Sequence, residues 1–325
     1  MSFSLNFCKL PPSTGYGKMC HNIRNELIDK NFTISETGSY EILIQSLDWI
    51  RHPKHQHHDY ERSIVFTMGE SSILPQSSVL KCNKAKFIIV PSEYNKTIFI
   101  NNGITRPIGV VPLGVDTNIY KKTFRKKDDN CVFGFVGTFY KRKNIPFLIK
   151  SFKKAFTNEK CKLIIKTSAN CYNQYGVDSN LQIQFITEDY SEKQMVNFYN
   201  SLDGFISCSH AEGFGLPQLE SMACGVPVIS PCFGGITEFF DSSVGYDVDY
   251  KIIESSDSHY KGEWCSAIEE SLIDKMMCVY KDREKAKSLG EKALKRAKIF
   301  TWEKTAENLI KAIDKWRYSL LVGSI

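Results

Sequence analysis

Residues 204–230 constrain the fold more than any other part of the chain. A short apolar strand is predicted at 204–208, and a glycine-containing loop follows it. Pro217 then opens a helix that Gly225 ends, and residues 226–230 are predicted to form the next strand. A strand–loop–helix–strand unit of this kind normally joins parallel strands, so the segment predicts an α/β fold.

The loop before this helix suits an anionic ligand. Gly213 and Gly215 let the backbone approach a ligand closely, and the free N–H groups at a helix start favour an anion. Glu212 lies at the loop mouth, and Glu220 is predicted in the first turn of the helix. Two carboxylates beside an anion site suit a ligand that carries both phosphate and sugar hydroxyls. Taken alone, a tight turn with a solvated and a helix-stabilising glutamate is the commoner explanation.

Length and composition set the class of protein. At 325 residues the chain is too long for one ordinary domain and fits two α/β domains. Hydrophobic residues make up 42% and charged residues 24%, which is typical of folded soluble proteins. No apolar run reaches the roughly 18 residues that span a bilayer, and residues 1–12 lack a secretory pattern. With eleven cysteines and no CxxC pair, we expect reduced thiols and a cytoplasmic location.

One cationic cluster stands out at residues 121–127, in a chain whose net charge is only +6. Asp128 and Asp129 follow it at once, and no aromatic-rich basic groove accompanies it, so no nucleic-acid partner is expected. We interpret the cluster as a solvated linker. Weak peripheral contact with the cytosolic face of a membrane is the alternative.

Strand and helix signals alternate along both halves of the chain. Ser191 and Gln194 fit a capping box, and Asn144 is placed to cap another helix. The chain is predicted to be helical from about residue 266 to 320, with a break near 300–302. Apolar helix stripes are interpreted as core. The strand signals in the first half lie at 5–10, 42–44 and 63–67, within 86–92, which ends in a Pro-Ser turn, and within 108–116, where a loop follows the strand. Those in the second half lie at 131–137, 163–165, 183–186, 204–208 and 226–230.

Three further stretches carry candidate ligand-binding groups. Gly15 and Gly17 are predicted in a loop before a helix that starts at Lys18; this is a plausible phosphate cradle, although such a turn is more often only a turn. A basic loop at 138–144 is expected to be exposed. Four of the seven histidines lie at 52–58, where a proline and the lack of a nearby cysteine favour a surface loop over a metal site.

The string EGFGLP at 212–217, with Glu220 and MACGVPVI at 222–229, resembles the retaining, nucleotide-sugar-dependent glycosyltransferases of family 4. The Glu-x7-Glu spacing is the hallmark of that family. The likeness covers roughly the whole chain and is thinner between residues 30 and 60. The other matching stretches, in the family's order, are Gly15–Gly17, 90–92, 111–116, Gly137 with Lys143, Gly234 and Gly235 with Glu238, and 300–303.

The resemblance implies an α/β fold with two Rossmann-like domains of the GT-B type and a cleft between them. Residues 1–121 would form the acceptor-side domain, which is short for this fold, and 122–130 a linker. Residues 131–300 would bind the nucleotide sugar. Residues 301–325 would form a C-terminal helix that packs back towards the first domain.

The implied activity is transfer of a hexosyl group from a nucleoside diphosphate sugar to a hydroxyl on a glycan, lipid or protein-linked acceptor. The resemblance implies retention of the anomeric configuration and no metal or other cofactor. Two alternatives stay open on the same fold. One is a non-catalytic member that binds nucleotide sugars or partner proteins, and the other is a sugar-nucleotide epimerase.

The resemblance also implies what individual residues do. In the family, the first glutamate lies beside the donor sugar and the second accepts hydrogen bonds from the ribose, which assigns these places to Glu212 and Glu220. Lys143 and Arg142 match the cations that neutralise the leaving diphosphate, and with Glu212 they are the predicted catalytic residues. The other predicted substrate-binding residues are Gly15, Tyr16, Gly17, Thr138, Phe214, Gly215, Leu216, and Ile186 and Thr187 beside the nucleotide base.

Two departures from the family pattern matter. Thr138 stands where the family often has arginine, so either one phosphate cation is missing or Arg142 replaces it. Many members place a histidine near the reacting carbon, but the corresponding residues 67–70 contain none. Glu70 is the candidate active-site residue in this stretch, and the alternative is a buried or capping glutamate with a structural function only. We therefore assign no general base, since in the proposed front-face mechanism the leaving phosphate itself takes the acceptor proton.

Overall fold

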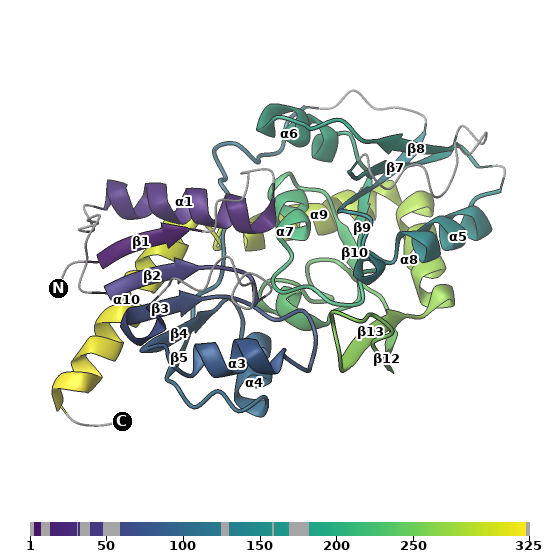
Figure 1. The fold of residues 1–325 in the computed structure, drawn as a ribbon. Helices are drawn as coiled ribbons and strands as arrows, with labels where there is room; N and C mark the ends of the chain where they lie inside the picture. Colours follow the sequence, from purple (N-terminus) through teal and green to yellow (C-terminus); the bar gives the residue numbers. More distant parts are fainter. Residues whose placement is uncertain are drawn as a thin grey trace. The chain divides into compact units, whose positions relative to one another are not determined.

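The computed structural model describes residues 3–7, 14–30, 32, 40–47, 59–124, 130–157, 159–168 and 182–322. The chain divides into two compact units. Unit 1 comprises Met1–Gly114, Ser258–Gly262 and Phe300–Ile325, and unit 2 comprises Val115–Asp257 and Glu263–Ile299. Each unit is built on a parallel sheet with helices, which confirms the predicted α/β class with two Rossmann-like domains (Figure 1).

Unit 1 contains a five-stranded sheet in the order β1-β2-β3-β4-β5, and every neighbouring pair is parallel. The residues of β3 and β4 are all buried, as expected for parallel strands covered on both faces. The strands are β1 (Phe3–Phe7), β2 (Tyr40–Ile44), β3 (Ser63–Phe66), β4 (Phe87–Val90) and β5 (Ile108–Val110). The helices are α1 (Gly15–Asp29), α3 (Gln76–Cys82), α4 (Glu93–Asn101) and α10 (Trp302–Val322), with a 3-10 turn, η2 (Tyr60–Arg62).

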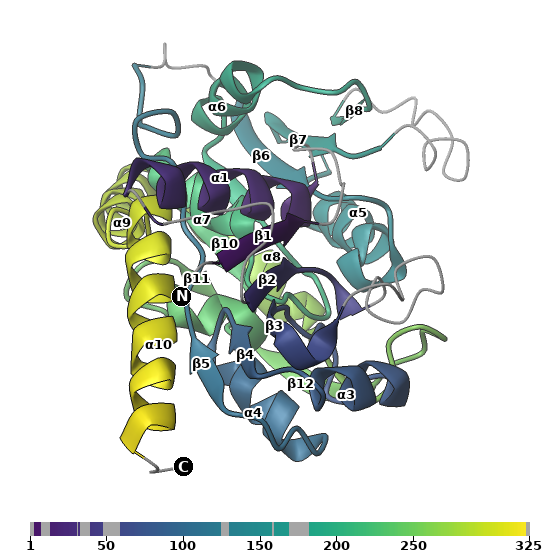
Figure 2. The ribbon, with the colours of Figure 1, turned by 60° about the vertical axis from the view of Figure 1, so that its left-hand side comes forward.

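The two faces of this sheet are covered by different helices. Ile88 and Val90 share a buried cluster with residues of α3 and α4. Phe87 points to the opposite face, because successive strand residues alternate, and Trp316 of α10 stacks on it at 5.6 Å. Helix α10 also packs against α1 (Figure 2). The final helix is therefore part of the core of unit 1.

Unit 2 contains a six-stranded parallel sheet in the order β11-β10-β9-β6-β7-β8. Read from the other edge, the chain order is 3-2-1-4-5-6, the order of a Rossmann sheet. The strands are β6 (Cys131–Val136), β7 (Cys161–Lys166), β8 (Ile183–Ile186), β9 (Gly204–Ile206), β10 (Val228–Ser230) and β11 (Tyr246–Asp247). The helices are α5 (Ile145–Ala155), α6 (Glu192–Asn200), α7 (Leu216–Ala223), α8 (Glu269–Lys281) and α9 (Arg283–Ala297), with 3-10 turns η3 (Lys141–Lys143) and η5 (Gly234–Glu238).

The two predicted helix caps of unit 2 differ in outcome. The capping box of Ser191 and Gln194 at the start of α6 is confirmed. Asn144 precedes α5 as predicted, but it has a φ of 53° and its side chain makes no capping hydrogen bond. Its left-handed backbone, rather than a side-chain cap, separates η3 from α5.

An antiparallel hairpin ends inside the beginning of the predicted C-terminal helical region. Strands β12 (Tyr250–Glu254) and β13 (Glu263–Ala267) pair with each other, and helix α8 begins only at Glu269. The prediction of helix from about residue 266 was therefore wrong at its start. Trp264 and Cys265 are buried in β13, and this burial outweighs the weak helical pattern of the segment.

Within the described ranges, no helix combines the length and the hydrophobicity that crossing a bilayer requires. The histidine-rich stretch at 52–58 and the basic residues 125–127 lie outside those ranges. The described residues contain no group of three or more His, Cys, Asp or Glu side chains placed to hold a metal ion.

Candidate active site

Two loops leave the carboxyl ends of the neighbouring strands β6 and β9 in unit 2. The strand order changes direction between them, because β7 and β8 continue on one side and β10 and β11 on the other. In open α/β sheets, ligands bind outside the strand ends at such a switch point. The loop after β6 contains η3, and the loop after β9 leads into α7. The topology alone therefore selects these two loops as the candidate site.

Glu212 joins the two loops through an ion cluster. The Nζ atom of Lys143 lies 2.6 Å from Oε1 of Glu212, and Nη1 of Arg142 lies 3.2 Å from Oε2. Arg142 also donates to the carbonyl oxygen of Ala211 at 2.7 Å. All three charged residues are buried, with 7–8% exposed, so the expected exposure of the basic loop was wrong for Arg142 and Lys143. Ion pairing with Glu212 draws them inward.

The electrostatics of the cluster fix the charge of Glu212. Burial by itself would raise the pKa of Glu212, but Lys143, Arg142 and a hydrogen bond from Ser209 lower it to about 2. The carboxylate is therefore ionised at neutral pH. Two cations and one carboxylate give the cluster a net charge of +1. An anion that reaches this site meets cations already oriented by the protein.

Close backbone packing holds the Glu212 loop in place. Gly215 is the N-cap of α7 with a φ of 101°, a conformation that favours glycine. The N–H of Gly235 donates to the carbonyl oxygen of Glu212 at 2.8 Å. A Cβ atom on Gly235 would overlap the carbonyl group of Gly213. The turn that contains Gly234 and Gly235 thus packs closely against the Glu212 loop and holds it in place.

Glu220 lies in α7 in a different environment. The helix begins at Leu216, one residue before the predicted Pro217, so Glu220 falls beyond the first turn in which it was predicted. Its side chain is buried, with 4% exposed, and Oε2 accepts a hydrogen bond from the hydroxyl of Tyr199 at 2.8 Å. Burial, followed by the nearby Glu220 carboxylate, raises the pKa of Tyr199, so the phenol stays protonated and donates.

Sequence reasoning missed several polar residues around Glu212. Gln218 of α7 donates to the Ser207 hydroxyl at 3.0 Å, and Ser207 donates to Ser209 at 3.4 Å. The backbone N–H of His210 donates to the backbone carbonyl oxygen of Arg142 at 2.8 Å. The imidazole ring of His210 stacks on the indole of Trp264, with the ring centres 5.3 Å apart. Burial lowers the pKa of His210. The only sequence signal was a run of small polar residues immediately after a buried strand.

The predicted glycine loop of unit 1 is placed differently from the prediction. Gly15 and Gly17 lie in the first turn of α1, not in a loop before Lys18. Thr14 is the N-cap, and its hydroxyl accepts the N–H of Gly17 at 3.1 Å. That cap moves the helix start towards the N-terminus. The hydroxyl of Tyr16 accepts the N–H of Met68 at 3.3 Å, which ties α1 to the 67–70 stretch with half-buried Glu70.

The other predicted binding residues of unit 2 lie at the carboxyl ends of strands or in the α7 loop. Thr138 and Thr187 are half-buried in the segments after β6 and β8. Phe214 is buried and packs on Phe239 at 5.2 Å, so its side chain belongs to the core and only its backbone remains for a ligand. Leu216 is the first residue of α7.

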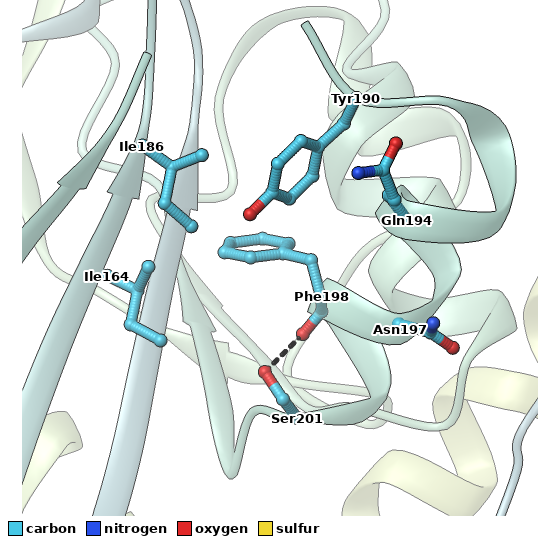
Figure 3. Close-up of a pocket in the computed structure, with 7 residues that line it drawn as sticks. All are labelled: Ile164, Ile186, Tyr190, Gln194, Asn197, Phe198 and Ser201. Atoms are coloured by element: carbon cyan, nitrogen blue, oxygen red, sulfur yellow. Dashed lines mark hydrogen bonds between the residues drawn. The ribbon is translucent and has the colours of Figure 1, made fainter. Parts of the chain in front are cut away.

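Ile186 lines a shallow pocket of about 220 Å³ between α6 and strands β7 and β8 (Figure 3). Aliphatic, aromatic and amide side chains line it, and the Nζ atom of Lys166 lies 5.6 Å from the ring centre of Tyr190. Such a lining suits a planar group with polar edges. The lining residues are Ile164, Ile186, Tyr190, Gln194, Asn197, Phe198 and Ser201.

A family comparison matches the part of the chain that carries this site. Residues 116–296 match the family described as "Glycosyl transferases group 1". The chain belongs to this family. The predicted glycosyltransferase resemblance is therefore confirmed.

Curated relatives of this glycosyltransferase-family chain are distant. It is 22% identical over 272 residues to D-inositol 3-phosphate glycosyltransferase of Paenarthrobacter aurescens, covering 78% of this chain and 61% of that protein. It is 29% identical over 255 residues to a probable sucrose-phosphate synthase of Thermosipho melanesiensis, covering 71% and 55%. The chain thus matches little more than half of the length of these relatives.

Solved structures confirm the GT-B fold. Sucrose-phosphate synthase from Thermosynechococcus elongatus is similar with a TM-score of 0.67 at 14% identity, covering 95% of this chain and 81% of that one. Anabaena Alr3699/HepE in complex with UDP-glucose is similar with a TM-score of 0.68 at 13% identity, covering 96% and 99%. At such low identity the likeness concerns the fold alone.

Proposed function

We propose that this chain is a retaining glycosyltransferase, which moves a hexosyl group from a nucleoside diphosphate sugar to a hydroxyl acceptor. The observation that carries the proposal is the buried Lys143–Glu212–Arg142 cluster at the switch point of the unit 2 sheet. A diphosphate develops negative charge as it leaves the sugar. Oriented cations in a water-poor site stabilise that charge more than solvated cations do.

The donor would bind with its diphosphate beside Lys143 and Arg142 and its sugar beside Glu212. The start of α7, with the amides of Gly215 and Leu216, supplies further positive potential for a phosphate. An incoming phosphate would compete with Glu212 for Lys143 and release the carboxylate towards the sugar. No metal ion is then required to balance the leaving group, and we propose metal-independent transfer.

The proposed reaction balances without a separate base. The bond between the anomeric carbon and the diphosphate oxygen breaks, and a bond from that carbon to the acceptor oxygen forms on the same face. The acceptor proton passes to the departing diphosphate. The products are the glycoside and the nucleoside diphosphate. Here Glu212 orients the sugar and stabilises positive charge on it, and Lys143 and Arg142 stabilise the leaving group.

UDP-sugars are the first donors to test. The solved relatives include Alr3699/HepE in complex with UDP-glucose and pneumococcal GtfA in complex with UDP and GlcNAc, which supports this donor class for the present chain. The pocket beside Ile186 and Tyr190 offers apolar and amide groups for a base. The acceptor can be a glycan, a lipid or a protein-linked hydroxyl, and each belongs in the screen.

The direct test is a calorimetric and turnover screen of wild-type protein against UDP-, GDP- and ADP-sugars, with the matching nucleosides as controls. We expect one nucleotide-sugar class to bind and the matching nucleoside to bind far more weakly, because the cluster recognises phosphate. Retention is checked by the anomeric configuration of the product in NMR spectra. A product with inverted anomeric configuration would contradict the proposal, and so would nucleosides that bind as tightly as nucleotide sugars.

A non-catalytic nucleotide-sugar-binding protein is the second candidate. Thr138 stands where the family often has arginine, so one phosphate cation is missing from the usual place. Donor binding without transfer to any acceptor and without slow donor hydrolysis would favour that candidate. Interconversion of the free nucleotide sugar would instead indicate an epimerase.

A further inference from the structure

Tyr199 and Glu220 form a second buried polar contact, separate from the ion cluster at Glu212. Tyr199 lies in α6 and Glu220 in α7, and the hydroxyl donates to Oε2 at 2.8 Å. We propose that Tyr199 is a positioning residue, which orients the Glu220 carboxylate to receive the ribose hydroxyls of the donor. This inference rests on the proposed function. Nothing in the family resemblance or the comparisons assigns a task to Tyr199.

The surroundings of Tyr199 make it a rigid support. Its side chain has no exposed surface. Its ring packs against Phe205 of β9 at 5.8 Å, against Phe198 at 5.5 Å and edge-on against Tyr120 at 6.1 Å. With the ring held on several sides, the hydroxyl has a fixed position. A hydrogen bond from a fixed donor then restricts the rotation of the carboxylate that accepts it.

The chemistry of the pair suits an arrangement in which Tyr199 donates and Glu220 only accepts. A phenol can donate one hydrogen bond, whereas an ionised carboxylate offers about four acceptor positions. The Tyr199 contact therefore takes one position and sets the direction of the others. Two neighbouring ribose hydroxyls can be received only by a carboxylate whose plane is correctly turned. Tyr199 fixes that plane without contacting the donor itself.

A purely structural tyrosine would have different consequences. Tyr199→Phe keeps the ring and removes the hydroxyl alone. If Tyr199 only fills the core, the variant loses stability and binds all nucleotides equally well or equally poorly. If it positions Glu220, the variant loses affinity only for nucleotides that carry ribose hydroxyls.

The test measures dissociation constants by calorimetry for UDP, GDP and ADP and for their 2′,3′-dideoxy forms. We expect Tyr199→Phe to weaken binding of the preferred ribonucleotide about five- to tenfold, and to leave the dideoxy form within twofold of wild type. The KM for the donor should rise while kcat changes little. Tyr246→Phe is the matched control, since Tyr246 is also buried in unit 2 and no hydrogen bond of its hydroxyl occurs among the described residues.

A second variant guards against a change in folding. In a Glu220→Gln background, Tyr199→Phe should cause no additional loss of ribose discrimination, because the two residues act together. Equal weakening of ribo- and dideoxy forms, or unchanged ribonucleotide binding, would overturn the inference while leaving the proposed function intact. Wild-type protein that binds none of the nucleotides would overturn the proposed function and the inference with it.

Discussion

Glu212 and Glu220 are eight positions apart and both buried, yet the regions around them differ in chemistry. Around Glu212, two cations from the loop after β6 approach the carboxylate and lower its pKa to about 2. Around Glu220, the neutral hydroxyl of Tyr199 donates a hydrogen bond to the carboxylate. In the proposed function, the first region exchanges one anion for another, whereas the second directs hydrogen bonds to the ribose. In this proposal the same residue type serves charge in one place and orientation in the other.

The largest effect that tests this difference is expected at the cations. Lys143→Met should lower kcat/KM about 100- to 1,000-fold, because one oriented group that stabilises the leaving charge is lost. It should also destabilise the fold by about 3 kcal/mol, because it breaks a buried ion pair. Steady-state kinetics and thermal melts measure the two effects. Lys141→Met is the control, since Lys141 lies in the same η3 turn but is exposed; a similar loss there would contradict a specific function of Lys143.

The pH dependence of stability should reveal the charge of Glu212. The pKa of Glu212 is lowered from 4.5 to about 2, so its ionisation favours the folded state by about 3 kcal/mol above pH 4.5. That contribution is lost as the pH falls from about 4.5 towards 2. Urea melts of wild type and Glu212→Gln should therefore differ most near pH 7 and converge in acid. A difference independent of pH would mean that the carboxylate is not ionised in the cluster.

Glu220→Ala should act on donor affinity rather than on charge. Loss of charge-assisted hydrogen bonds to the ribose is expected to cost roughly 1.5–3 kcal/mol, about ten- to a hundredfold in Kd. Calorimetry with the preferred nucleotide sugar measures this loss, and Glu270→Ala, an exposed position on α8, is the control. Unchanged donor binding in Glu220→Ala would mean that Glu220 does not bind the ribose, and the proposed difference between the two glutamates would be wrong.

The smallest effect is expected from metal removal. If the cations and the helix start balance the diphosphate charge, EDTA should leave the turnover rate unchanged. Turnover is measured with and without a molar excess of EDTA over protein, and then with added Mg²⁺ or Mn²⁺. A strict requirement for a divalent ion would contradict the charge balance proposed around Glu212.

The sequence predicted the α/β class and the β9–loop–α7–β10 unit, because glycine, proline and short apolar runs are local signals. It also brought Glu212, Lys143 and Arg142 into one hypothesis through the family resemblance. The burial of the two cations was not predicted, since basic residues in a loop are normally solvated. Their ion pairing depends on two loops about 70 residues apart in sequence meeting at one sheet edge.

Other features were missed for equally physical reasons. Tyr199 lies on the apolar face of a helix, a pattern that predicts burial in the core, and it is buried. Hydrophobic periodicity identifies the buried face of a helix. It does not show that the Tyr199 hydroxyl contacts the Glu220 carboxylate on another helix. The start of α1 depends on the single hydroxyl of Thr14. The β12–β13 hairpin depends on cross-strand pairing and on burial of Trp264, which no local signal announces.

The stack of His210 on Trp264 gives the protein an intrinsic optical reporter. The rings are nearly parallel at 8°, Trp264 is shielded from solvent, and His210 is two residues from Glu212. A shift of the Glu212 loop would alter the contact of the indole with the imidazole and with it the fluorescence. With the other three of the four tryptophans replaced by phenylalanine, titration with a nucleotide would follow the loop in real time.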